Sequence, residues 1–329
     1  MARPEHPKSR DQQASRISRS ETCDDKAAFH KPVDESDQQD QGAPVAQRAV
    51  PLAELLLDYR LYAFSSEDSY QNFKKNGRDA YHSLLLASEG REILGYPLFR
   101  AESGRTFLNF FRRDAPVLQI YKHVVLPFSA EPPGPEARLV ALAGDRSLYR
   151  VPFCSVFSQQ RFLSAISEYT LVFQRGGEPT YVRMRRKWTS QIYDTVFDGM
   201  HMRWHHRRLF SLLGGLSRKL VVLREDMPSL FAEMDDQCFS SHLSEKEISE
   251  LSVLAEYTAK SARLLPSRVA RVGELVVADT STVQPSDFNQ VPWNLEVIIC
   301  MNLLITFLEK QKLADSRRRA RNNSIHTMF

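Results

Sequence analysis

The stretch that decides the fold lies near the C-terminus and reads Pro292-Trp293-Asn294-Leu295-Glu296-Val297-Ile298-Ile299-Cys300-Met301-Asn302-Leu303-Leu304-Ile305-Thr306-Phe307-Leu308. As a helix it is apolar on every side, and such a helix must be enclosed by protein or by lipid. Its apolar part of about 12 residues spans about 18 Å, against roughly 30 Å of membrane hydrocarbon. Asn302 and Thr306 near its middle also argue against lipid. We therefore expect a helix threaded through the centre of one protein domain.

The sequence before this helix is typical of antiparallel strands joined by tight turns. Asp198-Gly199 suits a two-residue type I′ turn, and Gly176-Gly177 separates two further apolar runs. From about Gly95 onward, turn signals recur roughly every dozen residues, as in meandering sheets that form barrels or sandwiches. We predict a mainly β protein, in which a closed antiparallel β-barrel surrounds the C-terminal helix.

The two glycine turns also predict the registers of their hairpins. The expected cross-strand pairs are Phe173–Thr180, Leu171–Val182, Tyr169–Met184, Phe197–Met200, Thr195–Met202 and Tyr193–Trp204. These registers put mainly apolar side chains on one face, as a half-buried hairpin requires. The basic side chains left on the outward face are Arg183, Arg185, Lys187, His201, Arg203, His205 and Arg207.

Composition and turn signals divide the chain into segments. The first 48 residues are polar, with few large apolar side chains, and such a segment cannot offset its chain entropy by burial. Ser244-Glu245-Lys246-Glu247 is a capping box that opens a predicted helical insertion at 244–265. The expected segments are a disordered arm (1–48), a helical lead-in packed on the barrel, with helices at 52–59 and 79–89 (49–94), the barrel domain with its insertion (95–313) and a basic disordered tail (314–329).

Antiparallel hairpins that close on an apolar C-terminal helix, followed by the charged Glu309-Lys310-Gln311-Lys312, resemble the tubby C-terminal-like superfamily. That group includes tubby-like proteins, phospholipid scramblases and plant LURP-one-related proteins. The resemblance covers about residues 95–313, and it implies a closed barrel of about a dozen strands around a central helix. In tubby-like members, basic residues on the outer barrel surface bind phosphoinositide head groups. The residues here that match by chemistry are Arg183, Arg185, Lys187 and Arg203.

Positive charge is concentrated in two segments although the formal net charge is only +4. Residues 183–208 hold one concentration, and arginines can bind phosphate oxygens in bidentate geometry. We expect a non-catalytic binding or adaptor module that contacts anionic lipid of the phosphoinositide kind, or an acidic protein, through this face. The alternative is a solvated face whose charges pair with acidic loops. The predicted anion-binding residues are Arg183, Arg185, Lys187, Arg203, His205 and Arg207.

The second basic segment gives an alternative function. Its residues Arg317, Arg318, Arg319 and Arg321 form a run typical of nuclear import signals or nucleic-acid contacts, and a solvated tail is the other interpretation. A nuclear protein that uses this run is therefore the second hypothesis. A third is an enzyme with a non-local active site, because the sequence contains no nucleophile elbow, phosphate-binding loop or Rossmann fingerprint.

No cofactor or metal site is predicted. The cysteines Cys23, Cys154, Cys238 and Cys300 lack the short spacings of zinc sites. His201 and His205 would lie about 13 Å apart on a strand, too far to share a zinc ion. The first residues lack the apolar core of a secretory signal, and no segment reaches the length of a membrane span. We expect a monomer that is cytoplasmic, peripherally membrane-bound or nuclear.

Overall fold

The computed structural model describes residues 46–55, 58–88, 91–104, 114–160, 166–175, 177–187, 192–207, 217–231, 243–260, 268–279 and 291–326. Its strands are β1 (Ala46–Leu55), β2 (Asp58–Ala63), β3 (Leu85–Ser88), β4 (Arg91–Leu94), β5 (Phe99–Ser103), β6 (Leu118–Pro127), β7 (Arg138–Ala143), β8 (Arg146–Gln160), β9 (Ile166–Phe173), β10 (Thr180–Lys187), β11 (Ile192–Phe197), β12 (Met200–Arg207), β13 (Ser217–Val222), β14 (Val253–Ala259) and β15 (Val269–Asp279). The helices are α1 (Glu67–Asn76), the 3-10 helix η1 (Gly77–Ser83), α2 (Glu245–Ser249) and α3 (Trp293–His326).

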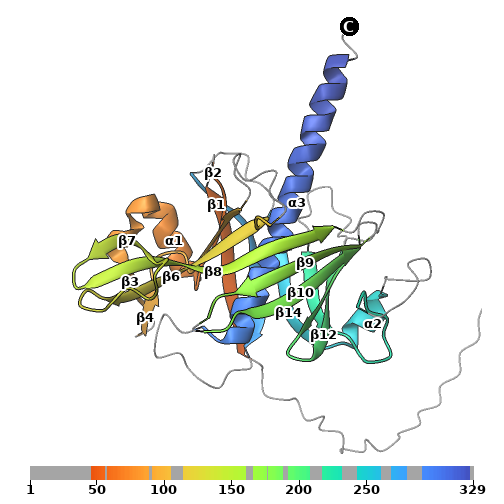
Figure 1. The fold of residues 1–329 in the computed structure, drawn as a ribbon, viewed down its shortest axis with the longest axis horizontal. Helices are drawn as coiled ribbons and strands as arrows, with labels where there is room; N and C mark the ends of the chain where they lie inside the picture. The colour runs from red at the N-terminus through yellow and green to blue at the C-terminus, as the bar shows by residue number, and fades with distance from the viewer. Residues whose placement is uncertain are drawn as a thin grey trace, which may run out of the picture. The chain divides into compact units, whose positions relative to one another are not determined.

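Twelve antiparallel strands close into the predicted barrel (Figure 1). Their order is β6-β5-β2-β1-β15-β14-β13-β12-β11-β10-β9-β8, and pairing between β6 and β8 closes the ring. Closure leaves no open sheet edge within the ring. β7 stands outside the ring, on the first half of β8, and β3 and β4 form a separate hairpin.

The predicted central helix is confirmed. Every residue of α3 from Leu295 to Leu308 is buried, so the barrel wall supplies the enclosure that an all-round apolar helix needs. Trp293 at its start packs against Phe173 and Phe197, with ring centroids 4.9 and 6.2 Å away. The helix therefore enters beside the β9–β10 and β11–β12 turns, crosses the barrel and projects beyond the strands at its C-terminal end (Figure 1).

Both predicted hairpin registers are confirmed, since all six expected cross-strand pairs are present. Asp198 and Gly199 have φ angles of 52° and 74°. Positive φ at both central residues is what a type I′ turn requires, and this explains why the Asp-Gly pair located the turn correctly.

The helical lead-in at 49–94 is only partly correct. Residues 52–55 belong to β1 and residues 58–59 to β2, and β1 is paired on both sides, with β15 and with β2. The stretch Leu52-Ala53-Glu54-Leu55 is mostly apolar, and local periodicity cannot separate so short a run from a short buried helix. The helix expected at 79–89 falls on the 3-10 helix η1, which is followed by the strand β3. The α-helix α1 lies before them, between β2 and η1.

The helical insertion is also shorter than predicted. Its capping box is present, with Ser244 and Glu247 each accepting a hydrogen bond from the other's backbone N–H. However, α2 ends at Ser249 and β14 begins at Val253, because the apolar residues beyond α2 point inward with the period of a strand. β14 then fills the place in the barrel between β13 and β15.

Disorder was predicted at both ends of the chain. Most of the expected disordered arm, residues 1–45, lies outside the described residues, and β1 begins at Ala46. The disordered tail expected from residue 314 is wrong as far as residue 326, because α3 continues to His326. The added residues are mostly good helix formers that extend a helix already nucleated in the barrel. Across the part of the chain that is described, no helix has the length and apolarity to cross a membrane.

Candidate functional site

The basic face predicted on β9 to β12 is a row of alternating charges. Glu168, Arg185, Asp194 and Arg203 are successive cross-strand neighbours on these four strands. Arg185 Nε donates to Glu168 Oε2 over 2.8 Å. Arg203 makes a bidentate pair with Asp194, in which both N–O distances are 2.7 Å. Opposite charges on adjacent strands stabilise a sheet, so these arginines already have anionic partners within the barrel wall.

The segment 223–231, which follows β13, covers this row. Arg203 Nη2 donates to the Pro228 carbonyl over 2.8 Å, and the Leu230 N–H donates to Asp194 Oδ2 over 2.8 Å. Arg185 donates to the Leu230 carbonyl over 3.0 Å. Arg203 and Asp194 are both fully buried. Arg203 is therefore a structural ion-pair partner, which corrects the expectation that it lies on an exposed face.

The other predicted anion-binding residues do not form one exposed group either. Arg183 is exposed, and with Arg185 it lies over the Phe231 ring, at 5.9 and 4.7 Å from the ring centroid. Lys187 and His205 are half-buried. The side chain of Arg207 lies outside the described part of the chain. The sheet register was predicted correctly. The partners that Glu168, Asp194 and segment 223–231 supply to the arginines were not predicted.

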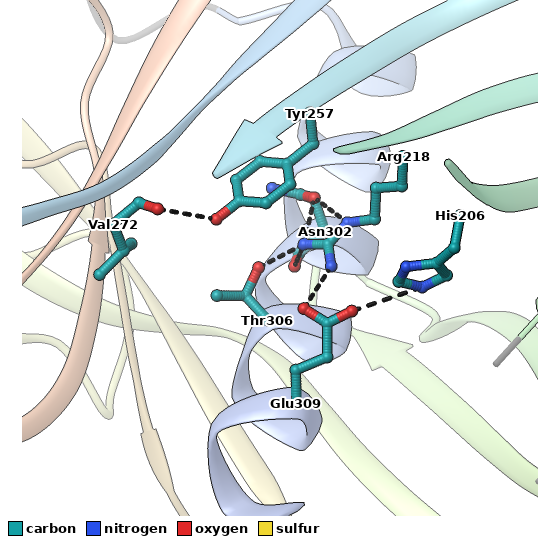
Figure 2. A network of polar contacts seen from close by, with 7 residues as sticks. All are labelled: His206, Arg218, Tyr257, Val272, Asn302, Thr306 and Glu309. Carbon is teal, nitrogen blue, oxygen red and sulfur yellow. Dashed lines mark hydrogen bonds and ion pairs between the residues drawn. The ribbon is translucent and has the colours of Figure 1, made fainter. Parts of the chain in front are cut away.

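A second polar network lies inside the barrel, on α3 (Figure 2). Arg218 of β13 is almost fully buried. Its Nε and Nη2 donate to Asn302 Oδ1 over 3.0 and 2.8 Å, and Nη2 also donates to Thr306 Oγ1 over 2.5 Å. Its Nη1 donates to Glu309 Oε2 over 2.7 Å. These three partners are four and three residues apart, so one guanidinium contacts one face of α3.

Aromatic side chains and a histidine surround Arg218. The Tyr257 ring centroid lies 4.1 Å from the guanidinium carbon, and Tyr257 Oη donates to the Val272 carbonyl over 3.1 Å. His206 Nε2 lies 3.4 Å from Glu309 Oε1 (Figure 2). Burial, and then the charge of Arg218, lower the pKa of His206 to about 3, so this imidazole is neutral at physiological pH. The network therefore has one cation and one anion, and it holds α3 in register with the barrel wall.

Asn302 and Thr306 were visible in the sequence as polar interruptions of an apolar helix. A buried amide or hydroxyl requires a hydrogen-bond partner, and that requirement is the signal that could have indicated this network. The partner itself, Arg218, is 84 residues away from Asn302 in the chain. No local pattern connects the two.

A third group of residues forms a pocket of about 480 Å³ on the barrel surface, beside β6, β7 and the first half of β8. Arg138 of β7 and Arg150 of β8 line it and are direct cross-strand neighbours. The Arg150 guanidinium carbon lies 4.8 Å from the Tyr121 ring centroid, which fixes its position. Glu136 is the carboxylate of the lining, which also includes prolines. Sequence reasoning missed this pocket because Arg138 and Arg150 stand alone in their local sequence.

The electrostatics of this pocket favour an anion. Burial, and then the charge of Arg100, lower the pKa of Arg150, and the charge of Glu102 opposes this change. Glu102 is occupied by Arg100 and Arg60, at 2.5 and 3.1 Å. Within the described residues, neither Arg138 nor Arg150 has a carboxylate partner at ion-pair distance, and Arg150 Nε has no hydrogen-bond partner. Two adjacent guanidinium groups thus remain available to a ligand.

The arginine run of the second hypothesis lies on the projecting part of α3. Arg317, Arg318 and Arg319 are exposed, and the side chain of Arg321 lies outside the described part. Lys310, where the helix leaves the barrel, pairs with Glu54 of β1. The described residues contain no group of three or more His, Cys, Asp or Glu side chains that could hold a metal ion.

Comparison with known proteins gives the family. The model of the DIA1 family matches residues 45–314. The chain belongs to the DIA1 family. It is 27% identical over 291 residues to the Saccharomyces cerevisiae protein YNL165W, covering 81% of this chain and 70% of that protein. It is 24% identical over 303 residues to protein DIA1 of the same yeast, covering 85% of each. No solved structure matches the chain.

Membership of the DIA1 family corrects the resemblance to the tubby C-terminal-like superfamily. That resemblance rested on the order of the hairpins and on one apolar helix. Those features specify a barrel around a helix, and they do not specify a family. The DIA1 match includes the barrel, the arginine pocket and the Arg218 network, whereas Arg317, Arg318 and Arg319 lie beyond its end.

Proposed function

We propose that this DIA1-family protein is a binding module that recognises a phosphate-type anion in the pocket between Arg138 and Arg150. The observation that carries the proposal is the direct cross-strand pairing of these two arginines in a concave surface. Like charges directly opposite each other destabilise a strand pair. An anion between the two guanidinium groups would offset that cost, and arginine suits phosphate because its planar donors match two oxygens at once.

The pocket also supports binding through its rigidity. Stacking on Tyr121 holds Arg150 before any ligand arrives, so less side-chain freedom is lost on binding. No serine, threonine, cysteine or histidine is among the described residues of the lining, which favours binding over catalysis. A lipid head group and a soluble phosphate ester present the same oxygens. We therefore propose the anion-binding surface on β6 to β8 rather than on β10 to β12.

Calorimetric titration with inorganic phosphate and with inositol hexakisphosphate tests this proposal. We expect saturable binding by the wild-type protein, at least about tenfold weaker in Arg150→Ala, because a charge-assisted hydrogen bond contributes about 1.5–3 kcal/mol. Arg138→Ala should behave in the same way. Arg183→Ala is the matched control, since Arg183 is an exposed arginine on another part of the barrel. Equal losses in the control and the pocket variants, or no saturable binding at all, would contradict the proposal.

A second candidate function, nucleic-acid contact, is favoured by the exposed arginines of α3. Arg317, Arg318 and Arg319 occupy consecutive positions, and the helix that carries them projects beyond the barrel (Figure 1). Contacts to phosphates weaken steeply as salt increases. If this function is correct, deletion of residues 315–329 abolishes low-salt binding to duplex DNA and leaves binding of inositol hexakisphosphate unchanged. Unchanged DNA binding after the deletion would exclude it.

A further inference from the structure

The pocket between Arg138 and Arg150 also contains a carboxylate, Glu136. This residue lines the pocket and stands two positions before Arg138 in the chain. Within the part of the chain that is described, its carboxylate makes no ion pair or hydrogen bond, with either arginine or with another group. A carboxylate that served to neutralise Arg138 or Arg150 would lie at ion-pair distance from one of them. The pocket therefore presents positive and negative groups that are held apart.

A tight turn fixes the backbone that carries Glu136. The Ala137 N–H donates to the Gly134 carbonyl over 3.1 Å, which closes a four-residue turn with Pro135 second and Glu136 third. Proline at the second position sets in advance the backbone angle that such a turn requires. Because β7 begins directly after Ala137, the turn holds Glu136 beside Arg138 before any ligand arrives.

Apolar groups line the space around these charges. Pro135, Ala137 and Pro152 belong to the lining, together with Tyr121. Pockets for small molecules combine apolar walls with a few fixed polar groups that set the orientation of the ligand. The walls of this pocket suit a short carbon chain, and its charges suit polar groups of opposite sign at the two ends of that chain.

The charges of the lining also indicate the net charge of the ligand. Arg138 and Arg150 are positive and Glu136 is negative, so the described lining has one positive charge in excess. A phosphate monoester carries nearly two negative charges at neutral pH, and an ammonium group on the same molecule would cancel one of them. A purely anionic ligand would instead be repelled by Glu136. An amino phosphate ester thus matches the pocket both in net charge and in the separation of its charges.

We infer that the ligand of this pocket is a phosphate ester that also carries an amino group, with the phosphate between Arg138 and Arg150 and the ammonium group at the Glu136 carboxylate. This inference rests on the proposed phosphate-type site and names the class of its ligand. Phosphoethanolamine, in which two carbons separate the phosphate ester oxygen from the amine, is the simplest member. The same chemistry occurs in soluble monoesters and, as a diester, in the head group of a lipid.

Calorimetric titration with phosphoethanolamine and with ethyl phosphate, which lacks only the amino group, tests the inference. We expect the wild-type protein to bind phosphoethanolamine about fivefold more tightly, a preference of the size that an exposed ion pair gives. Glu136→Gln should bind the two esters equally. Arg150→Ala should weaken the binding of both. Glu131→Gln is the matched control, since Glu131 is an exposed carboxylate just before this turn and does not line the pocket, and it should keep the wild-type preference.

Glycerophosphoethanolamine, the water-soluble diester that corresponds to a lipid head group, distinguishes the two sources of the ligand. If it binds more tightly than phosphoethanolamine, and Glu136→Gln weakens it, the inference is supported and the source is a lipid head group. If it binds more weakly, while the preference for phosphoethanolamine over ethyl phosphate is present, the inference is supported and the source is a soluble monoester.

The negative outcomes separate this inference from the proposed function. If the wild type binds phosphoethanolamine and ethyl phosphate equally, or if Glu136→Gln keeps the wild-type preference, the amino-group inference is overturned and the arginine site stands. An equal loss of preference in Glu131→Gln also overturns it. If neither ester nor inorganic phosphate binds, both proposals are overturned. Glu136 and Glu131 are exposed, so both variants should unfold thermally like the wild type.

Discussion

At the residue scale, Arg218 ties the barrel wall to its central helix, because it satisfies three polar groups on α3 at once. Arg218→Met should lower the free energy of unfolding by about 3–5 kcal/mol, since it leaves Glu309 and Asn302 without their cationic partner inside the barrel. Denaturant unfolding measures this loss. Arg183→Met, at an exposed arginine, should change stability by no more than about 0.5 kcal/mol. If Arg218→Met also lost no more than about 0.5 kcal/mol, the network would add little to the free energy of unfolding.

Buried histidines should make the protein sensitive to acid. Burial lowers the pKa of His123 to about 3, and its Nδ1 lies 2.8 Å from the Pro97 carbonyl. The unfolded state takes up a proton near pH 6.5, so between about pH 6.5 and 3 it binds protons that the folded state excludes. His206 acts in the same direction. The free energy of unfolding should therefore fall as pH decreases, by up to about 1.4 kcal/mol per pH unit for each histidine.

Denaturation at a series of pH values measures this slope. His123→Gln should remove about half of the slope that the two buried histidines contribute. We expect this change in slope whatever free energy the variant loses in packing at neutral pH. His201 is exposed on β12, and His201→Gln is the control that should keep the wild-type slope. If His123→Gln and His201→Gln titrate alike, His123 accepts a proton in the folded protein.

At the element scale, hairpins joined by tight turns could be predicted in detail. The Asp198-Gly199 turn and the glycine turn fixed both registers because turn chemistry and apolar alternation are local. The end of β1 was interpreted as a helix because one of its two partner strands, β15, lies far away in the sequence. The basic face was predicted as exposed for a similar reason: segment 223–231, which covers it, carries no local sign of where it folds.

That covering segment depends on Asp194, which accepts from both Arg203 and the Leu230 N–H. Asp194→Asn should cost about 3–5 kcal/mol, because it leaves Arg203 buried without a carboxylate. It should also release segment 223–231, so that trypsin cleaves after Arg224 faster than in the wild type. Asp198→Asn is the control, since Asp198 is exposed in a turn and asparagine tolerates its positive φ. Unchanged cleavage in Asp194→Asn would mean that other contacts hold the segment.

At the scale of the whole molecule, the fold could be predicted because one sequence property had few structural solutions. A helix that is apolar all round and too short to span a membrane requires a wall on every side, and strand-like flanking sequence identifies that wall as a barrel. Family and binding surface did not follow from the same property. The proposed binding surface depends on which residues face outward, and Arg138 and Arg150 meet only through the pairing of β7 with β8.

The barrel should therefore depend on α3 as its core. Ile299 and Leu304 are at most 1% exposed, and a carboxylate at either position would be buried among apolar side chains at a cost of several kcal/mol. Ile299→Asp or Leu304→Asp should abolish cooperative thermal unfolding, because no strand can repack around a charged core. Leu313→Asp is the matched control on the same helix, since Leu313 is 55% exposed where α3 has left the barrel, and it should unfold like the wild type. A soluble Ile299→Asp protein of near-wild-type stability would mean that the barrel closes without α3 at its centre.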